Sequence, residues 1–168
     1  EILPGRKGLE SLMKKRKIRL YLGIDPTGAM LHLGHTIPLR KLQQFADLGH
    51  EASLVVGTGT VLSGDPSQRA HARPQITEKE IAANMKTWKD QAEKIVDFSR
   101  VTIKYNGDWL KKLKLPDVLT IASNISAPHL LQRDMFQERI KRGDTVWMHE
   151  ILYPLLQGYD SVAMDVDL

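Results

Sequence analysis

The chain has 168 residues, of which 42% are hydrophobic and 26% charged, and it contains no Cys. This length and composition are typical of one globular domain and exclude two large domains or wholesale disorder. The lack of Cys excludes disulfides, a thiolate zinc site and a cysteine nucleophile. No apolar run approaches the roughly 20 residues that cross a bilayer, and the first residues lack a signal-peptide core, so we expect a soluble, cytoplasmic protein.

Positive charge is in slight excess, with 24 Lys and Arg against 20 Asp and Glu, a formal net charge of +4. It gathers in three short clusters, at residues 14–17, 111–114 and 139–142. Such clusters neutralise phosphates in some proteins, but more often they are solvated helix ends. The charge pattern therefore leaves contact with nucleic acid open.

The first part of the chain has the pattern of a βαβ unit. Residues 18–24 alternate between apolar and polar or small side chains, which predicts a strand that ends at the turn Asp25-Pro26-Thr27-Gly28. Apolar residues then recur at helical spacing between Leu39 and Ala46, and a short apolar run at 52–56 ends in Gly-Thr-Gly-Thr. Units of this kind build parallel sheets covered by helices, so we predict the α/β class.

The rest of the chain reads as mostly helical. Thr77 and Glu80 form a capping box, from which an apolar stripe predicts one helix of about five turns reaching Val96. The other predicted elements are a strand at 101–105, a helix after Pro116, a helix from Ser126 to about Gly143, a helix around 150–159 and an alternating strand at 162–166. That last strand has no following helix to cover it, so we expect the chain to be a fragment of a longer protein.

A candidate ligand site follows the first strand. Gly23-Ile24-Asp25-Pro26-Thr27-Gly28 leads to His32-Leu33-Gly34-His35 at the mouth of the next helix, where backbone N–H groups attract anions. The loop is neither a Walker A loop nor a GxGxxG fingerprint. The two His share one helix face, and Gly34 leaves room for a flat ring against the backbone. Nucleotide binding and a plain surface His pair both fit this spacing.

Two further segments carry polar groups. Tyr153, Gln157 and Asp160 fall at i, i+4 and i+7 on one side of a predicted helix whose other side is apolar. A phenol, an amide and a carboxylate suit a small polar ligand such as an amino acid, although an ordinary amphipathic surface helix would show the same pattern. Asp65, in the turn Ser63-Gly64-Asp65-Pro66-Ser67, follows the second strand and is a possible partner for an ammonium group.

These three segments, in this order, resemble a known family. GIDPTGAMLHLGH resembles the HIGH signature region of class I aminoacyl-tRNA synthetases, and SGDPS and YPLLQGYD resemble segments of bacterial-type tyrosyl-tRNA synthetases. The resemblance covers essentially the whole chain and implies the N-terminal catalytic portion. It implies a Rossmann-like fold whose first half lies at about 17–65, with an inserted helical dimer-interface region at about 105–148 and the start of a truncated second half at 149–168.

The resemblance also implies roles for particular residues. ATP would be bound by Gly23, Asp25, Thr27, His32, Gly34 and His35, and the catalytic residues, which act on the phosphates, would be Thr27, His32 and His35. The phenol of substrate tyrosine would meet Tyr21 and Asp160, and its ammonium group would meet Asp65, Tyr153 and Gln157. ATP would come with Mg²⁺, for which the sequence shows no dedicated metal site.

The implied activity is that of a tyrosine–tRNA ligase, which makes tyrosyl-adenylate from L-tyrosine and ATP and transfers tyrosine to tRNA(Tyr), as a homodimer. The family's Gly-Gly-x-Asp-Gln segment, its Lys-Met-Ser-Lys-Ser loop and its RNA-binding C-terminal domain are not in this chain, so we expect little activity from it alone. The competing readings are a tryptophanyl-tRNA synthetase, which shares the HIGH region, and a non-catalytic RNA- or partner-binding module derived from a synthetase.

Overall fold

Three strands form a parallel sheet in the order β1–β2–β3: β1 (Arg19–Ile24), β2 (Glu51–Val56) and β3 (Val101–Tyr105). The computed structural model that shows them describes residues 5–63 and 77–168. All three strands were predicted to within one residue at each end. Because Ile24 pairs with Val56 and Val56 with Tyr105, the carboxyl ends of the strands lie level at one edge of the sheet.

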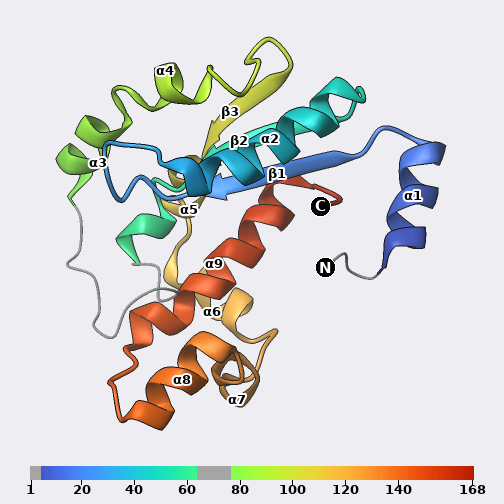
Figure 1. The fold of residues 1–168 in the computed structure, drawn as a ribbon. Helices are drawn as coiled ribbons and strands as arrows, with labels where there is room; N and C mark the ends of the chain where they lie inside the picture. The colour runs from blue at the N-terminus through green and yellow to red at the C-terminus, as the bar shows by residue number, and fades with distance from the viewer. Residues whose placement is uncertain (1–4, 64–76) are drawn as a thin grey trace.

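Helices cover both faces of the sheet, as predicted for an α/β fold (Figure 1). α2 (Leu33–Asp47) packs against β1 and β2 on one face, and α9 (Met148–Met164) crosses the other. The core lies between α2 and the sheet, where Leu39 and Leu42 meet the inward side chains of the strands. Its buried members are Ile18, Leu20, Leu39, Leu42, Ala46, Ala52, Leu54, Val96 and Val101.

The prediction of one long helix over residues 81–96 is wrong. Thr77 and Glu80 do form the predicted capping box, but the helix it begins, α3 (Glu78–Met85), stops after two turns. A second short helix, α4 (Trp88–Ala92), follows Thr87, whose ψ of 0° departs from helical geometry. The apolar stripe indicated which side of the segment faces the core. Periodicity alone does not reveal a break between two helices, and this break changes the direction of the helix axis.

A group of short helices lies beside α9 (Figure 1). It consists of α5 (Gly107–Leu110), α6 (Leu115–Ala122), α7 (Ala127–Leu131) and α8 (Asp134–Arg142). The helix predicted after Pro116 is α6, but the single helix predicted from Ser126 to Gly143 is wrong, because extended backbone at Arg133 divides it into α7 and α8. Gly143 ends α8 in the left-handed conformation that favours glycine, as expected for a helix stop.

The strand predicted at 162–166 is also wrong, because α9 continues to Met164 and ends at Asp165, which has a left-handed φ of 51°. Only then does the chain extend along β1. The Leu168 N–H donates to the Arg19 carbonyl at 3.2 Å, and the Tyr21 N–H donates to the Leu168 carbonyl at 3.1 Å.

Sequence patterns also did not predict α1 (Arg6–Lys15), α5 or the 3₁₀ turn η1 (Thr60–Leu62). Among the described residues, none of the helices has both the length and the apolar character needed to span a bilayer.

Candidate active site

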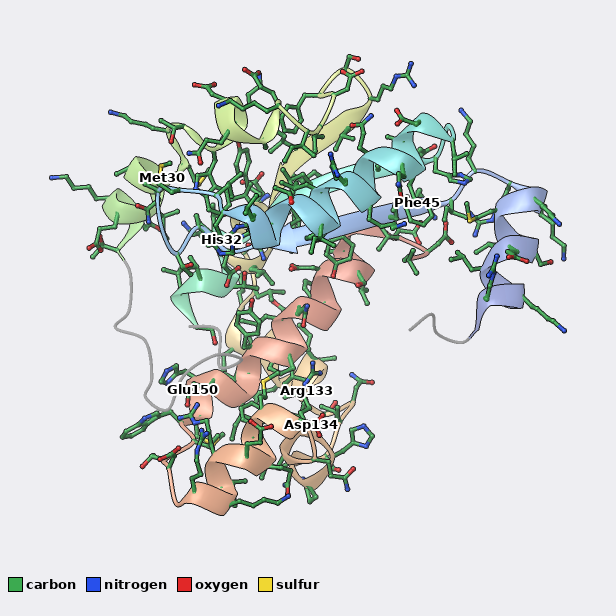
Figure 2. All side chains as sticks on the ribbon, viewed as in Figure 1. Met30, His32, Phe45, Arg133, Asp134 and Glu150 are labelled. Carbon is green, nitrogen blue, oxygen red and sulfur yellow. The ribbon has the colours of Figure 1, made fainter. Side chains whose placement is uncertain are left out.

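The loop after β1 and the start of α2 form one wall of a cleft of about 630 Å³. Figure 2 shows His32 at the start of α2 and Met30 on the loop that leads to it. All six residues expected to bind ATP line this cleft, together with Tyr153 from α9: Gly23, Asp25, Thr27, His32, Gly34 and His35. The structure thus brings the predicted nucleotide residues together at the carboxyl edge of the sheet, where parallel sheets bind ligands.

His32 and His35 cap the N-terminus of α2 with their own side chains. His32 Nδ1 accepts from the Gly34 N–H at 3.1 Å, and His35 Nδ1 accepts from the His32 N–H at 3.1 Å. Because each Nδ1 is an acceptor, the proton of each neutral ring is on Nε2, which remains available as a donor. Burial, followed by the neighbouring His32, lowers the pKa of His35, so that ring is neutral at pH 7.

Gly34 has a steric role beside these rings. A Cβ at this position would lie 2.8 Å from Cε1 of His32, closer than side-chain contacts allow. We expected the bare backbone of Gly34 to accept a flat ring, and in this structure the ring that approaches it is that of His32. Any larger residue would displace the imidazole that caps the helix.

Asp25 links the loop to the opposite wall of the cleft. Its Oδ2 accepts from the Tyr153 hydroxyl at 3.0 Å, and its Oδ1 accepts from Thr60 Oγ1 at 2.6 Å. Gly57, directly after β2, makes room for this carboxylate, because a Cβ there would lie 1.8 Å from Asp25 Oδ1. Tyr153, expected at the substrate ammonium group, is therefore held beside the predicted nucleotide loop.

Asp160 lies buried, with only 3% of its surface exposed. Its Oδ1 accepts from Trp109 Nε1 at 2.7 Å and its Oδ2 from Asn106 Nδ2 at 3.0 Å. Burial raises the pKa of this carboxyl group, and the two hydrogen bonds oppose that rise. A buried carboxylate with two fixed donors is a preorganised acceptor for one more hydrogen bond.

Asn106 and Thr60 connect the two carboxylates. The second Nδ2 hydrogen of Asn106 is donated to Thr60 Oγ1 at 3.0 Å, and Thr60 in turn donates to Asp25. The carbonyl of the Asn106 side chain accepts from the Gly59 N–H at 2.7 Å, so the amide is fully used. One buried chain of hydrogen bonds therefore joins Asp25 to Asp160 across the ends of β1, β2 and β3.

Tyr21 lies against α9 rather than directly on Asp160. Its hydroxyl donates to the Gln157 carbonyl at 3.2 Å and lies 3.1 Å from Ser161 Oγ. Burial raises the pKa of this phenol, and the charge of Asp160 adds to the rise. Tyr21 thus reaches Gln157 only through its backbone carbonyl, while the Gln157 side chain is exposed and Asp65 lies outside the described residues.

Two residues of the polar side of α9, Tyr153 and Asp160, contact groups at the sheet edge through their side chains, which an ordinary surface helix would not do, whereas the side chain of Gln157 is exposed. Sequence reasoning missed four residues of the site: Thr60, Asn106, Trp109 and Ser161. Asn106 directly follows β3 and Thr60 lies four residues after β2, so the rule that ligands bind beyond the carboxyl ends of parallel strands could have indicated both. Trp109 and Ser161 carried no such signal.

Comparison with known proteins agrees with this arrangement. The family described as tRNA synthetases class I (W and Y) matches residues 13–168. The chain belongs to this family. The class I synthetase resemblance predicted from the motifs is therefore confirmed.

Several curated tyrosine–tRNA ligases are similar to this class I synthetase chain. The protein from Thermotoga maritima is 44% identical over 160 residues, covering 95% of this chain and 40% of the relative. Tyrosine–tRNA ligase 2 of Vibrio cholerae is 40% identical and covers 100% of this chain and 42% of the relative. The chain thus spans about two fifths of the length of these relatives.

Solved structures show the same fold. A C-terminally truncated mitochondrial tyrosyl-tRNA synthetase from Aspergillus nidulans superposes with a TM-score of 0.81 at 27% identity, covering 95% of this chain and 49% of that one. Tyrosyl-tRNA synthetase of Archaeoglobus fulgidus, solved with L-tyrosine, has a TM-score of 0.73 at 24% identity, which supports the fold alone. The predicted Rossmann-like class is confirmed.

Proposed function

We propose that this chain carries the tyrosine and ATP sites of a tyrosine–tRNA ligase. The observation that carries the proposal is the buried hydrogen-bonded chain from Asp25, beside the His32–His35 cap, to Asp160. It joins a phosphate-facing loop to a buried carboxylate acceptor, as an enzyme that couples a nucleotide to a hydroxylated amino acid requires. The names of the relatives that are 40–44% identical support tyrosine over tryptophan within the family.

In the proposed reaction, an oxygen of the tyrosine carboxylate attacks the α-phosphorus of ATP. A bond forms between this oxygen and the α-phosphorus as the bond from the α-phosphorus to the oxygen of the β-phosphate breaks, which yields tyrosyl-adenylate and pyrophosphate. A hydroxyl group at the 3′ end of tRNA(Tyr) then attacks the carbonyl carbon of the adenylate, and AMP leaves. Thr27, His32 and His35 would donate hydrogen bonds to the phosphates as negative charge builds on the leaving group. The Nε2 atoms of the two His suit this role, because each Nδ1 is already used as an acceptor.

Substrate tyrosine would lie between β1 and α9. Tyr21 and Asp160 would hold its phenol, and Tyr153, Gln157 and Asp65 would hold its ammonium group. Magnesium would arrive on the phosphates of ATP. Across the part of the chain that the structure describes, no three His, Asp or Glu side chains converge to form a metal cage.

Tyrosine-dependent exchange of labelled pyrophosphate into ATP, measured on the complete protein, tests this proposal. Tyrosine, and not tryptophan, is expected to support exchange.

His32→Ala should lower the rate of pyrophosphate exchange about a hundredfold or more while ATP affinity changes little, because the contact strengthens only in the transition state. His129→Ala, an exposed His elsewhere, is the control. Specific RNA binding without exchange would instead identify a non-catalytic module.

We also propose that the protein is a homodimer through the inserted helical region. Within that region, Leu110, Leu130 and Phe136 are buried within the chain and are not available to an interface. Leu115 and Leu119 support the proposal, since they lie one turn apart on α6 and are 70% and 60% exposed. Light scattering should show a dimer that Leu119→Asp converts to a monomer. A wild-type monomer at high concentration would contradict it.

A further inference from the structure

The loop between β1 and α2 is held by side chains of α3 and α4, one of which, Trp88, also lines the cleft. Asn84 Nδ2 donates to the Pro26 carbonyl at 3.0 Å, and Trp88 Nε1 donates to the Gly28 carbonyl at 2.9 Å. Gln91 Nε2 donates to the Ala29 carbonyl at 2.8 Å. Three side chains therefore bind three carbonyls in chain order along residues 26–29.

Gln91 also binds the loop through its other amide atom. Gln91 Oε1 accepts from the Leu31 N–H at 2.8 Å. Gln91 Nε2 also donates to Thr87 Oγ1 at 2.8 Å, and the Thr87 hydroxyl in turn donates a longer hydrogen bond, at 3.4 Å, to the Ala29 carbonyl. A glutamine that both donates and accepts fixes two separate peptide groups of one loop. Both contacts lie just before His32, the cap of α2.

The three side chains come from both sides of the break between α3 and α4, Asn84 from α3 and Trp88 and Gln91 from α4. Residues 84, 88 and 91 are at i, i+4 and i+7, the spacing of one helix side, yet one straight helix would hold them to a single line. The turn at Thr87 lets the donors follow the curved loop. The feature that contradicts the predicted long helix is thus the feature that brings these donors to the loop.

The loop makes few backbone hydrogen bonds of its own. Between Pro26 and Leu31, the one described bond of this kind is the Thr27 N–H to the Asp25 carbonyl at 2.8 Å. Met30 is 73% exposed, so apolar packing does not anchor the loop tip. Ordering a loop costs about 1–2 kcal/mol of backbone entropy per residue, which contacts made elsewhere must offset.

We propose that Asn84, Trp88 and Gln91 are positioning residues that hold the nucleotide loop, and with it Thr27 and His32, in its binding geometry before ATP arrives. These three side chains act on the loop backbone, to which they donate their hydrogen bonds, and not directly on phosphate. The effect on catalysis rests on the proposed function, whereas the effect on loop order does not. A site that is ordered in advance loses less free energy when charge develops on the phosphates.

Amide hydrogen exchange tests the ordering directly, without any activity. Gln91→Met keeps the length of the side chain and removes both loop contacts. The Leu31 amide should exchange at least about tenfold faster in this variant, as expected for the loss of one or more buried hydrogen bonds. Core amides such as that of Leu54 should be unchanged, which separates loop release from general destabilisation. Asp90→Asn, an exposed change on the same helix, should leave Leu31 as in the wild type.

Kinetics of the complete protein test the consequence. Gln91→Met and Trp88→Phe should each lower kcat for pyrophosphate exchange about tenfold or more, with KM for tyrosine within about twofold of wild type, because the loop faces the phosphates and not the amino acid. Unchanged exchange of the Leu31 amide would overturn the inference, as would equal kinetic losses in Asp90→Asn. Absence of pyrophosphate exchange in the wild type would refute the proposed function. Amide exchange at Leu31 would still decide the inference about loop order.

Discussion

Asp160 shows how one buried carboxyl group is oriented by its neighbours. Burial alone favours the protonated form, and the N–H groups of Trp109 and Asn106 offset part of that cost. Both donors come from the segment after β3, so the carboxylate is oriented by an element more than fifty residues away. An acceptor arranged in this way discriminates a hydroxylated side chain from one without a hydroxyl.

Asp160→Asn should therefore weaken tyrosine binding far more than phenylalanine binding. The amide keeps the volume but loses the charge, and it has only one oxygen with which to accept from Asn106 and Trp109, so the phenol loses a hydrogen bond to a charged group worth roughly 1.5–3 kcal/mol, or about 10- to 150-fold in affinity. Titration calorimetry with the two amino acids would measure it. Asp108→Asn, an exposed neighbour of Asn106, is the matched control. Equal losses for tyrosine and phenylalanine would show that α9 does not form the side-chain pocket.

At the scale of elements, the start of α9 is fixed to α8 by a buried ion pair. Arg139 Nη1 lies 2.8 Å from Glu150 Oε1, and both side chains are under 5% exposed. Arg139 also donates a hydrogen bond from Nη2 to the Thr145 carbonyl. Burial would raise the pKa of Glu150, but the hydrogen bonds from Arg139 and the Trp147 N–H outweigh it, and the pKa lies below its usual value. Figure 2 shows Glu150 near the start of α9, above α8. Arg139, first grouped with a solvated basic cluster, is instead part of the core.

Glu150→Gln is expected to lower the free energy of unfolding by about 3–5 kcal/mol, because it leaves the Arg139 charge buried without its partner. Urea unfolding followed by circular dichroism would measure the loss. Adding Arg139→Met to this variant should recover part of it, since the unpaired charge is then gone. The control is Arg142→Met, which breaks an exposed pair with Asp144 and should cost no more than about 1 kcal/mol. Equal costs for the two pairs would contradict the buried role.

At the scale of the whole molecule, Asp167 ties the end of the described chain to its beginning. Its Oδ2 accepts from Arg16 Nη1 at 2.8 Å and its Oδ1 accepts from Arg16 Nη2 at 2.5 Å. The Oδ2 atom also accepts from the Arg19 backbone N–H at 2.9 Å. The guanidinium group of Arg16, followed by the backbone N–H of Arg19, holds the pKa of Asp167 far below its usual value. The turn after α9 is thereby fixed to the edge of β1.

This shift predicts the sign of a pH effect on stability. A carboxyl group with a lowered pKa in the folded state stabilises the fold above its unfolded pKa of about 3.9, and that stabilisation is lost as the pH falls. The melting temperature of the wild type should therefore drop between pH 5 and pH 2 by more than that of Asp167→Asn. Asp165→Asn, whose side chain is 84% exposed, should follow the wild type. Parallel curves for wild type and Asp167→Asn would contradict the prediction.

Local patterns in the sequence were sufficient for the three strands of the sheet, the α/β class and the loop between β1 and α2. Period-2 alternation and helix caps involve neighbours within a few residues, so they can be recognised without the fold. The rule that ligands bind beyond the carboxyl ends of parallel strands then placed Asp25, His32 and His35 at one edge. The family resemblance added Tyr153 and Asp160 to the same site.

Only the tertiary structure decided which surfaces of these elements meet. The turn at Thr87, the extension of α9 through 162–164 and the burial of Arg139 each depend on a partner elsewhere in the chain, which local periodicity cannot encode. The same holds for Asn106 and Thr60, whose roles arise because the ends of three strands place them between two carboxylates. A sequence pattern specifies a preferred local conformation and an apolar side, whereas the satisfaction of buried polar groups is settled only when distant segments are brought into contact.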